Sequence, residues 1–282
     1  MTWSEHTVTR DGVRLVCQDW GGPGQPVVLL HGLAGHAGEW DQTAQRLSPR
    51  YRVVAPDQRG HGASERHPQD VSRGAYVADV IAVLEQLALR RPVVLVGQSL
   101  GGHTAMLTAA AHPERVRALV LVEAGPGGPN PNVPADIGGW LDSWPTPFRS
   151  REAAAQFLGG GPVGTGWAAG LEERGGGWWP RFDREVMTRS LAENARRSFW
   201  HEWEQVMCPT LVVLAQSGII PQQEAEEMLR QRPTTVAVSI LRTGHDLHLE
   251  QPGTLHAVLS DFLEDLAFST PGGGPRRGAA SG

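Results

Sequence analysis

The sequence of 282 residues is long enough to bury a sizeable hydrophobic core, in one large domain or in two smaller ones. Hydrophobic residues make up 40% of the chain and charged residues 20%, the ordinary balance of a globular protein. The formal net charge is −5 and no run of basic residues occurs, so the composition argues against a nucleic-acid partner.

The two cysteines and the distribution of apolar residues indicate the cellular compartment in which the protein is expected. Cys17 and Cys208 stand far apart and outside any CxxC pattern, which argues against a disulfide framework or a metal site. Residues 1–12 are polar and lack the apolar stretch of a signal peptide. No run of about 18 apolar residues offers a membrane span. We therefore expect a cytoplasmic protein that uses no metal, no cofactor and no membrane.

Strand-like runs follow one another along the chain. An opening hairpin is expected at residues 6–20, where Asp11-Gly12 supplies the turn. Continuous apolar runs come after it, and such runs are typical of strands buried on both faces of a sheet. They lie at residues 27–31, 52–56, 93–96, 118–122, 210–215 and 235–241.

Helical patterns alternate with these strands. In residues 76–89, apolar side chains recur at spacings of three and four, as on the buried face of an amphipathic helix. Strands that alternate with helices in this way predict an α/β fold with a mostly parallel, doubly wound sheet.

The alternation stops in residues 125–207, a segment rich in glycine and proline that holds seven of the ten tryptophans. We interpret this segment as a lid or cap inserted into an α/β core formed by residues 1–124 and 208–268. The Gly/Pro-rich tail, residues 269–282, is expected to be disordered.

The pentapeptide Gly97-Gln98-Ser99-Leu100-Gly101 lies between a buried strand and an alanine-rich helical segment. In that setting GxSxG indicates a nucleophile elbow, because the sharp turn needs small residues at both ends. The alternative is a serine that caps the helix beside packing glycines, which the flanking context disfavours. We predict that Ser99 is a catalytic nucleophile.

Four motifs together resemble the α/β-hydrolase family. They are His31-Gly32-Leu33, the loop DQRGHGAS at residues 57–64, the elbow GQSLGG and the run GHDLHLEQP at residues 244–252. The resemblance covers nearly all of residues 5–267 apart from the lid, and it implies the α/β-hydrolase fold. It also implies an oxyanion hole formed by two backbone N–H groups, those of Leu33 and Leu100.

Among the 11 histidines, His245 has the setting of a catalytic base. It follows the last strand and Gly244, and the resemblance assigns the base to this position. His248, three residues further on, is expected to line the site or to cap a turn. His103, on the helix after Ser99, is expected to pack or to hydrogen-bond locally.

The sequence lacks an acid in the loop where most members of this family have one. That loop offers Gln216, Ser217 and Gly218, and none of them carries a negative charge. One explanation is a disabled hydrolase that has become a small-molecule receptor. The other moves the acid to Glu123, at the end of a buried strand, as in a subset of the family that includes zearalenone-type lactonases. We favour the second explanation, which completes a serine–histidine–glutamate triad.

The aromatic lid indicates a bulky apolar or aromatic substrate. Most of its tryptophans are expected to build the lid's own core, but Trp178 and Trp179 follow three glycines and are predicted to contact substrate. The expected reaction is acyl transfer from an ester or lactone to water, with a zearalenone-type macrolactone as the narrowest choice. A carbon–carbon hydrolase, a general esterase and a perhydrolase stay open, as does a homodimer.

Overall fold

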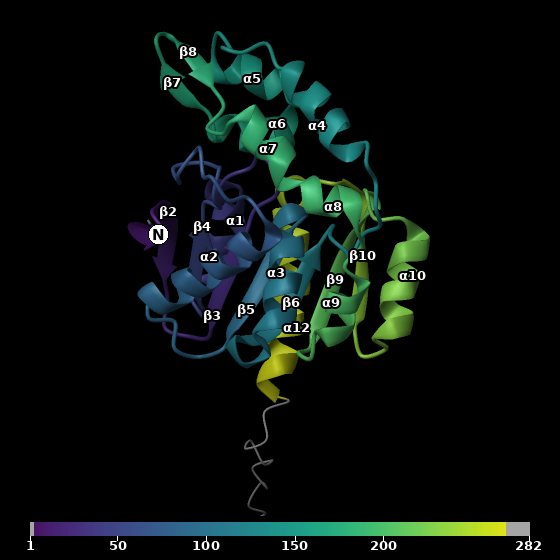
Figure 1. Cartoon of the computed structure of the whole chain (residues 1–282). Coiled ribbons are helices and arrows are strands. Elements are labelled where there is room, and N and C mark those ends of the chain that lie inside the picture. The colour runs from purple at the N-terminus through teal and green to yellow at the C-terminus, as the bar shows by residue number, and fades with distance from the viewer. Residues whose placement is uncertain (1–2, 269–282) are drawn as a thin grey trace, which may run out of the picture.

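The fold is an eight-stranded sheet between two layers of helices, with a further group of helices above one end of the sheet (Figure 1). The computed structural model describes residues 3–268, so the tail for which disorder is predicted lies outside the described residues. The strands of the sheet are β1 (Ser4–Arg10), β2 (Val13–Gly21), β3 (Pro26–Leu30), β4 (Arg52–Pro56), β5 (Val93–Gln98), β6 (Val116–Val122), β9 (Thr210–Ser217) and β10 (Val236–Gly244).

The strand order is β1-β2-β4-β3-β5-β6-β9-β10. The hairpin of β1 and β2 is antiparallel, and so is the pairing of β2 with β4. Every other pair is parallel. This mostly parallel sheet confirms the predicted fold class. Because parallel strands are joined by crossovers, the loops at their carboxyl ends meet at one edge of the sheet.

The sheet buries both of its faces. Along β3, Val28 and Leu30 point into one hydrophobic cluster, whereas Val27 and Leu29 point into another, as the two-residue period of a strand requires. One face is covered by α2 (Arg73–Gln86), α3 (Leu100–Ala111), α9 (Trp200–Gln205) and α10 (Gln222–Gln231). The other is covered by α1 (Asp41–Leu47) and α12 (Pro252–Phe268).

Short helices lie in the loops. They are η1 (Ala37–Trp40), η2 (Pro113–Arg115) and α11 (Leu247–Glu250). The cap consists of α4 (Val133–Asp142), α5 (Arg151–Phe157), α6 (Gly161–Ala169), β7 (Glu172–Arg174), β8 (Gly177–Trp179), α7 (Arg184–Ser190) and α8 (Ala192–Arg196). The predicted insertion extended to residue 207, but α9 packs with the core helices: its Trp203 is fully buried in the cluster that contains α3.

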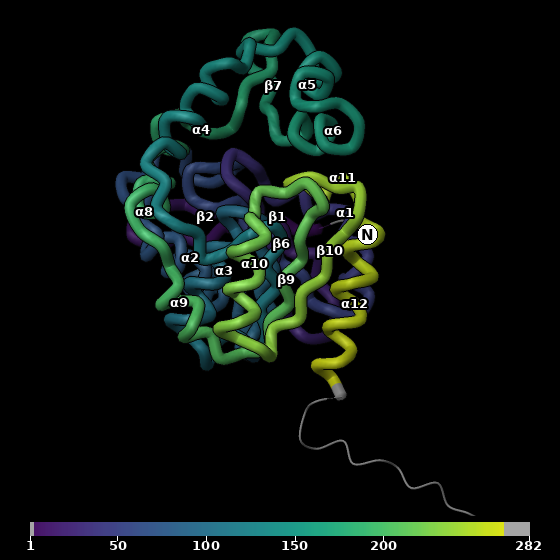
Figure 2. The backbone as a smooth tube through the Cα atoms, turned by 90° about the vertical axis from the view of Figure 1, so that its right-hand side faces the viewer, coloured from purple at the N-terminus to yellow at the C-terminus, as the bar shows by residue number. Residues whose placement is uncertain are grey.

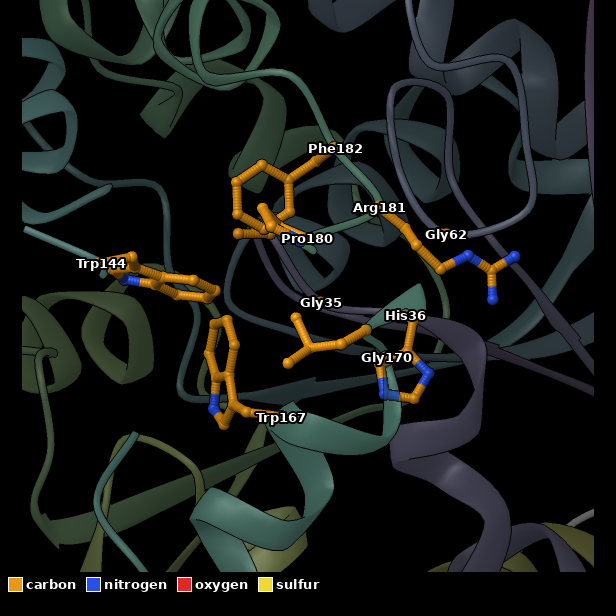
Figure 3. Close-up of a pocket in the computed structure, with 11 residues that line it drawn as sticks. Gly35, His36, Gly62, Trp144, Trp167, Gly170, Pro180, Arg181 and Phe182 are labelled. Atoms are coloured by element: carbon orange, nitrogen blue, oxygen red, sulfur yellow. The ribbon is translucent and has the colours of Figure 1, made fainter. Parts of the chain in front are cut away.

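The cap is attached to the core through α6, which contacts η1 and α11 (Figure 2). The Nδ1 atom of His36 accepts a hydrogen bond from Gly38 N, so Nε2 carries the proton and donates to Gly166 O at 3.1 Å. Trp167 Nε1 lies 3.3 Å from Asp246 Oδ2. The crevice at this junction measures about 10 Å³ (Figure 3), so it is a packing seam with no room for a substrate.

Candidate active site

Ser99 occupies a strained turn between β5 and α3. Its φ and ψ are 50° and −118°, an unfavourable region for a residue with a side chain, at a cost of about 1–3 kcal/mol. The neighbouring glycines permit the turn, since a Cβ atom on Gly97 would lie 2.3 Å from Gly101 O, and one on Gly101 would lie 2.3 Å from Leu30 O. The sequence therefore folds here into a sharp elbow that lifts Ser99 above the sheet.

Glu123 lies directly after β6, beside the elbow. Its side chain is 1% exposed, and its carboxylate accepts hydrogen bonds from Ala215 N at 2.6 Å and Ile219 N at 2.8 Å. The same Oε2 that binds Ile219 lies 3.5 Å from His245 Nδ1. A buried carboxylate is stable when donors surround it, so these two amides favour a charged acid that faces the imidazole.

The loop after β9, which has no acidic residue, surrounds the carboxylate of Glu123 from the neighbouring strand β6. Both backbone donors to Glu123 belong to β9 and the loop after it. A Cβ atom on Gly218 would lie 2.0 Å from Glu123 Oε2, closer than any real contact. Glu123 itself has a φ of 50°, which turns its side chain toward this loop. The glycine at position 218 thus leaves the space that the Glu123 carboxylate fills.

His245 lies between β10 and α11, with its loop held from two sides. Glu250 accepts hydrogen bonds from Gly244 N at 2.9 and 3.1 Å. The side-chain amide of Gln98 donates to His245 O at 3.1 Å and lies 3.2 Å from His245 Nε2. Because an amide NH₂ can only donate, His245 Nε2 is the acceptor and Nδ1 carries the proton that faces Glu123. This is the tautomer that a general base needs.

The three residues of the predicted triad and both predicted oxyanion residues line one cavity. A cavity of about 630 Å³ is lined by Ser99, Glu123, His245, Leu33 and Leu100. Leu100 is the first residue of α3, where backbone N–H groups point out of the helix. The cavity lies at the carboxyl ends of the strands, between the core and the cap.

Trp178 and Trp179, which are predicted to contact substrate, do not line the cavity that contains Ser99. Both belong to the β7–β8 hairpin, whose turn is formed by two of the three glycines, and neither lines the catalytic cavity. The Arg151 guanidinium stacks over Trp178 and that of Arg174 over Trp179. Short hairpin strands position these rings on the outer part of the cap.

Trp140 and Trp167 line the cavity in their place. Their rings meet edge to face, with centroids 5.6 Å apart. Nothing in the local sequence distinguishes these two tryptophans, because their positions depend on how α4 and α6 pack together.

His248 does not line the site. It is fully buried, and its Nε2 lies 3.3 Å from Glu39 Oε2, with the Trp40 ring 5.0 Å away. Burial raises the pKa of Glu39 to about 7, and burial lowers the pKa of His248 to about 4. Both shifts favour neutral groups, so this pair is a shared hydrogen bond beneath the His245 loop.

The loop at residues 57–64 is held in place by buried polar contacts. The carboxylate of Asp57 accepts hydrogen bonds from Ala37 N and Ala63 N, each at 2.7 Å. Arg59 forms a buried ion pair with Asp79 at 2.6 Å. No group of three or more potential metal ligands occurs within residues 3–268. None of the helices in that range has the length and apolar character needed to cross a membrane.

Comparison with known proteins gives the same family as the geometry. A family model described as "Alpha/beta hydrolase family" matches residues 27–258. The sn-1-specific diacylglycerol lipase of Mus musculus is 30% identical over 254 residues, which are 84% of this chain and 80% of the lipase.

Two further comparisons differ in extent. A non-heme chloroperoxidase of Streptomyces lividans is 42% identical over 120 residues, which are 42% of this chain and 44% of the chloroperoxidase. The chain thus matches less than half of that relative's length. The crystal structure of E-2-(acetamidomethylene)succinate hydrolase superposes with a TM-score of 0.85 and 21% identity, over 93% of this chain and 99% of that one.

The buried pair predicts a pH-dependent stability difference for Glu39→Gln. The folded-state pKa of Glu39, about 7, lies above its ordinary 4.5, so wild type loses stability through this group as pH rises from about 4.5 to 7. The amide cannot ionise. The variant should therefore gain about 1–3 kcal/mol relative to wild type across that range in urea unfolding. The exposed Glu226→Gln serves as a control, and a Glu39→Gln difference that stays constant with pH contradicts the prediction.

Proposed function

The chain belongs to the alpha/beta hydrolase family, and we propose that it is a carboxylic ester hydrolase with the triad Ser99, His245 and Glu123. The observation that carries the proposal is the Glu123 carboxylate, which lies 3.5 Å from His245 Nδ1 in the wall of the cavity that Ser99 also lines. A serine, an imidazole in the basic tautomer and a buried acid together supply nucleophilic catalysis.

In the proposed reaction, Ser99 Oγ attacks the ester carbonyl while His245 Nε2 takes the hydroxyl proton. The oxyanion that forms accepts hydrogen bonds from the N–H groups of Leu33 and Leu100. Glu123 stabilises the imidazolium, which then protonates the leaving alkoxide. Water attacks the acyl-enzyme by the same route, with His245 as the base, and frees the acid product.

The size and lining of the cavity support a bulky substrate. Its volume of about 630 Å³ falls within the usual range for small-molecule sites. Apolar side chains of the core loops and the cap contribute to its wall: Leu33, Val133, Ile137, Trp140, Trp167, Leu191, Ile219 and Ile220. The ester-cleaving lipase among the relatives, which aligns over most of the chain, favours an ester over a carbon–carbon bond. A lactone fits the same chemistry, and a zearalenone-type macrolactone is the narrowest form of the proposal.

Hydrolysis of p-nitrophenyl acetate, p-nitrophenyl hexanoate and zearalenone tests this function. Wild type should hydrolyse the p-nitrophenyl esters and react with a fluorophosphonate probe, whereas Ser99→Ala should lose at least about 10³-fold in kcat and all labelling. Ser260→Ala, on α12, is the control. Turnover of zearalenone supports the macrolactone form. A wild-type protein that neither hydrolyses an ester nor labels contradicts the proposal and favours a receptor.

Gly218→Ala tests the space reserved for the acid. The new Cβ atom would collide with Glu123 Oε2, so the carboxylate must move away from His245. We expect kcat/KM for p-nitrophenyl acetate to fall about 10- to 100-fold, and Tm to fall as well, because the displaced carboxylate loses backbone donors. Gly128→Ala is the matched control, since it lies in the cavity wall where an added Cβ meets nothing within 4 Å. Equal activity of the two variants would count against this role for Gly218.

A further inference from the structure

The imidazole of His103 has no function in the proposed triad, and neither of its ring nitrogens forms a hydrogen bond in the described structure. The residue is 5% exposed and lines the catalytic cavity, yet neither Nδ1 nor Nε2 has a partner in the described structure. The ring packs edge-on against Phe199, with centroids 4.3 Å apart. Of the two expected alternatives, packing or a local hydrogen bond, the structure shows packing. A buried polar group left unpaired is unfavourable, which points to a partner that enters the cavity.

The position of His103 relative to the nucleophile is set by α3. Its backbone N–H donates to Ser99 O at 2.9 Å, so the two residues are one helical turn apart. Four residues of α-helix rise about 6 Å. Because both residues line the cavity, a group four or five bonds from a carbonyl carbon at Ser99 has a length comparable to this rise.

Asn194 of α8 and Arg197, the residue after this helix, line the same cavity as His103. Leu191 and Asn194 are spaced by three and share one face of the helix, Arg197 follows the helix in an extended conformation, and α8 lies above α3 (Figure 1). The Oδ1 atom of Asn194 is buried and unpartnered. The Arg197 guanidinium stacks over the Phe199 ring at 3.8 Å, the same ring that contacts His103.

The charges around His103 are positive. Burial, followed by the nearby Arg73 and Arg197, holds the pKa of His103 well below its usual value. The ring is therefore neutral at pH 7 and has one N–H to donate. Arg73 is also buried, and its Nε and Nη1 atoms lack partners.

The two remaining carboxylates of the cavity are already engaged. Glu224 accepts a hydrogen bond from Gly127 N at 2.8 Å, and Asp246 accepts one from Trp167. Arg197 also pairs with Glu202 at 2.7 Å, although its side chain stays 49% exposed and has further N–H groups to donate. The group that best fits the unmet donors near His103 is thus an anionic acceptor.

We propose that His103, Asn194 and Arg197 form a subsite that binds a carboxylate on the substrate, about one helical turn from the scissile carbonyl. The inference rests on the proposed ester hydrolysis and narrows its substrate class to esters or lactones that carry an acid group. The imidazole N–H and the Arg197 guanidinium donate to the carboxylate oxygens. The side-chain amide of Asn194 donates its NH₂ after a half-turn about its terminal bond.

Two matched ester pairs test the subsite. Mono-p-nitrophenyl adipate and p-nitrophenyl hexanoate differ in a terminal carboxylate on the acyl side. The pair 4-acetoxybenzoate and methyl 4-acetoxybenzoate places the carboxylate on the alcohol side. Wild type should prefer the carboxylate in one pair by about tenfold or more in kcat/KM. Arg197→Gln and His103→Leu should each lower that preference toward one, whereas Arg184→Gln, an exposed cap arginine paired with Asp142, should keep it.

The outcomes separate the subsite from the proposed function. If wild type hydrolyses both members of each pair equally well, or if both variants keep the preference, the subsite is wrong and ester hydrolysis stands. If wild type hydrolyses no ester, the proposed function is wrong. The subsite is then tested separately by calorimetric titration of Ser99→Ala with monomethyl adipate. Saturable binding that Arg197→Gln weakens about tenfold supports the subsite, and an absence of binding overturns it.

Discussion

A carboxylate can be buried beside a histidine only if donors satisfy its oxygens, and this constraint organises the active site. Two backbone amides of β9 and its loop supply those donors to Glu123, so the loop that lacks an acid builds the environment of the Glu123 carboxylate. Glu123 has a positive φ, and Gly218 has no side chain that would collide with the Glu123 carboxylate. Both features belong to the arrangement that places this carboxylate beside the loop. An acid at position 218 and an acid at position 123 would compete for one space.

The other residues of the proposed site lie at the same end of the sheet. The elbow at Ser99, the acid after β6 and the base after β10 all leave the carboxyl ends of parallel strands, where crossovers bring loops together. The cap then closes over this edge, and α6 contacts the residue next to His245 through Trp167. Cap position and base position are therefore coupled through a hydrogen bond, and the cavity between them takes its shape from both.

Much of the fold could be predicted, and the three residues of the predicted triad line one cavity, because both results depend on local patterns. Apolar runs flanked by turns predicted the strands, and the position of Glu123 at the end of one run predicted a carboxylate close to His245. The substrate residues could not be predicted in this way: Trp178 lies in a hairpin and Trp167 on a helix that faces the base, although both are cap tryptophans beside glycines. Their difference arises from long-range packing, as does the burial of His248 against Glu39.

The most direct test of the relocated acid is kcat/KM for p-nitrophenyl acetate in Glu123→Gln, compared with Glu224→Gln. Both carboxylates line the cavity, but only Glu123 faces His245 Nδ1. The amide keeps the shape and removes the charge, so the account predicts a loss of about 10²- to 10⁴-fold for Glu123→Gln and a change within a few-fold for the control. A Glu123→Gln enzyme within about threefold of wild type would contradict the account, because no triad acid could then reside at this position.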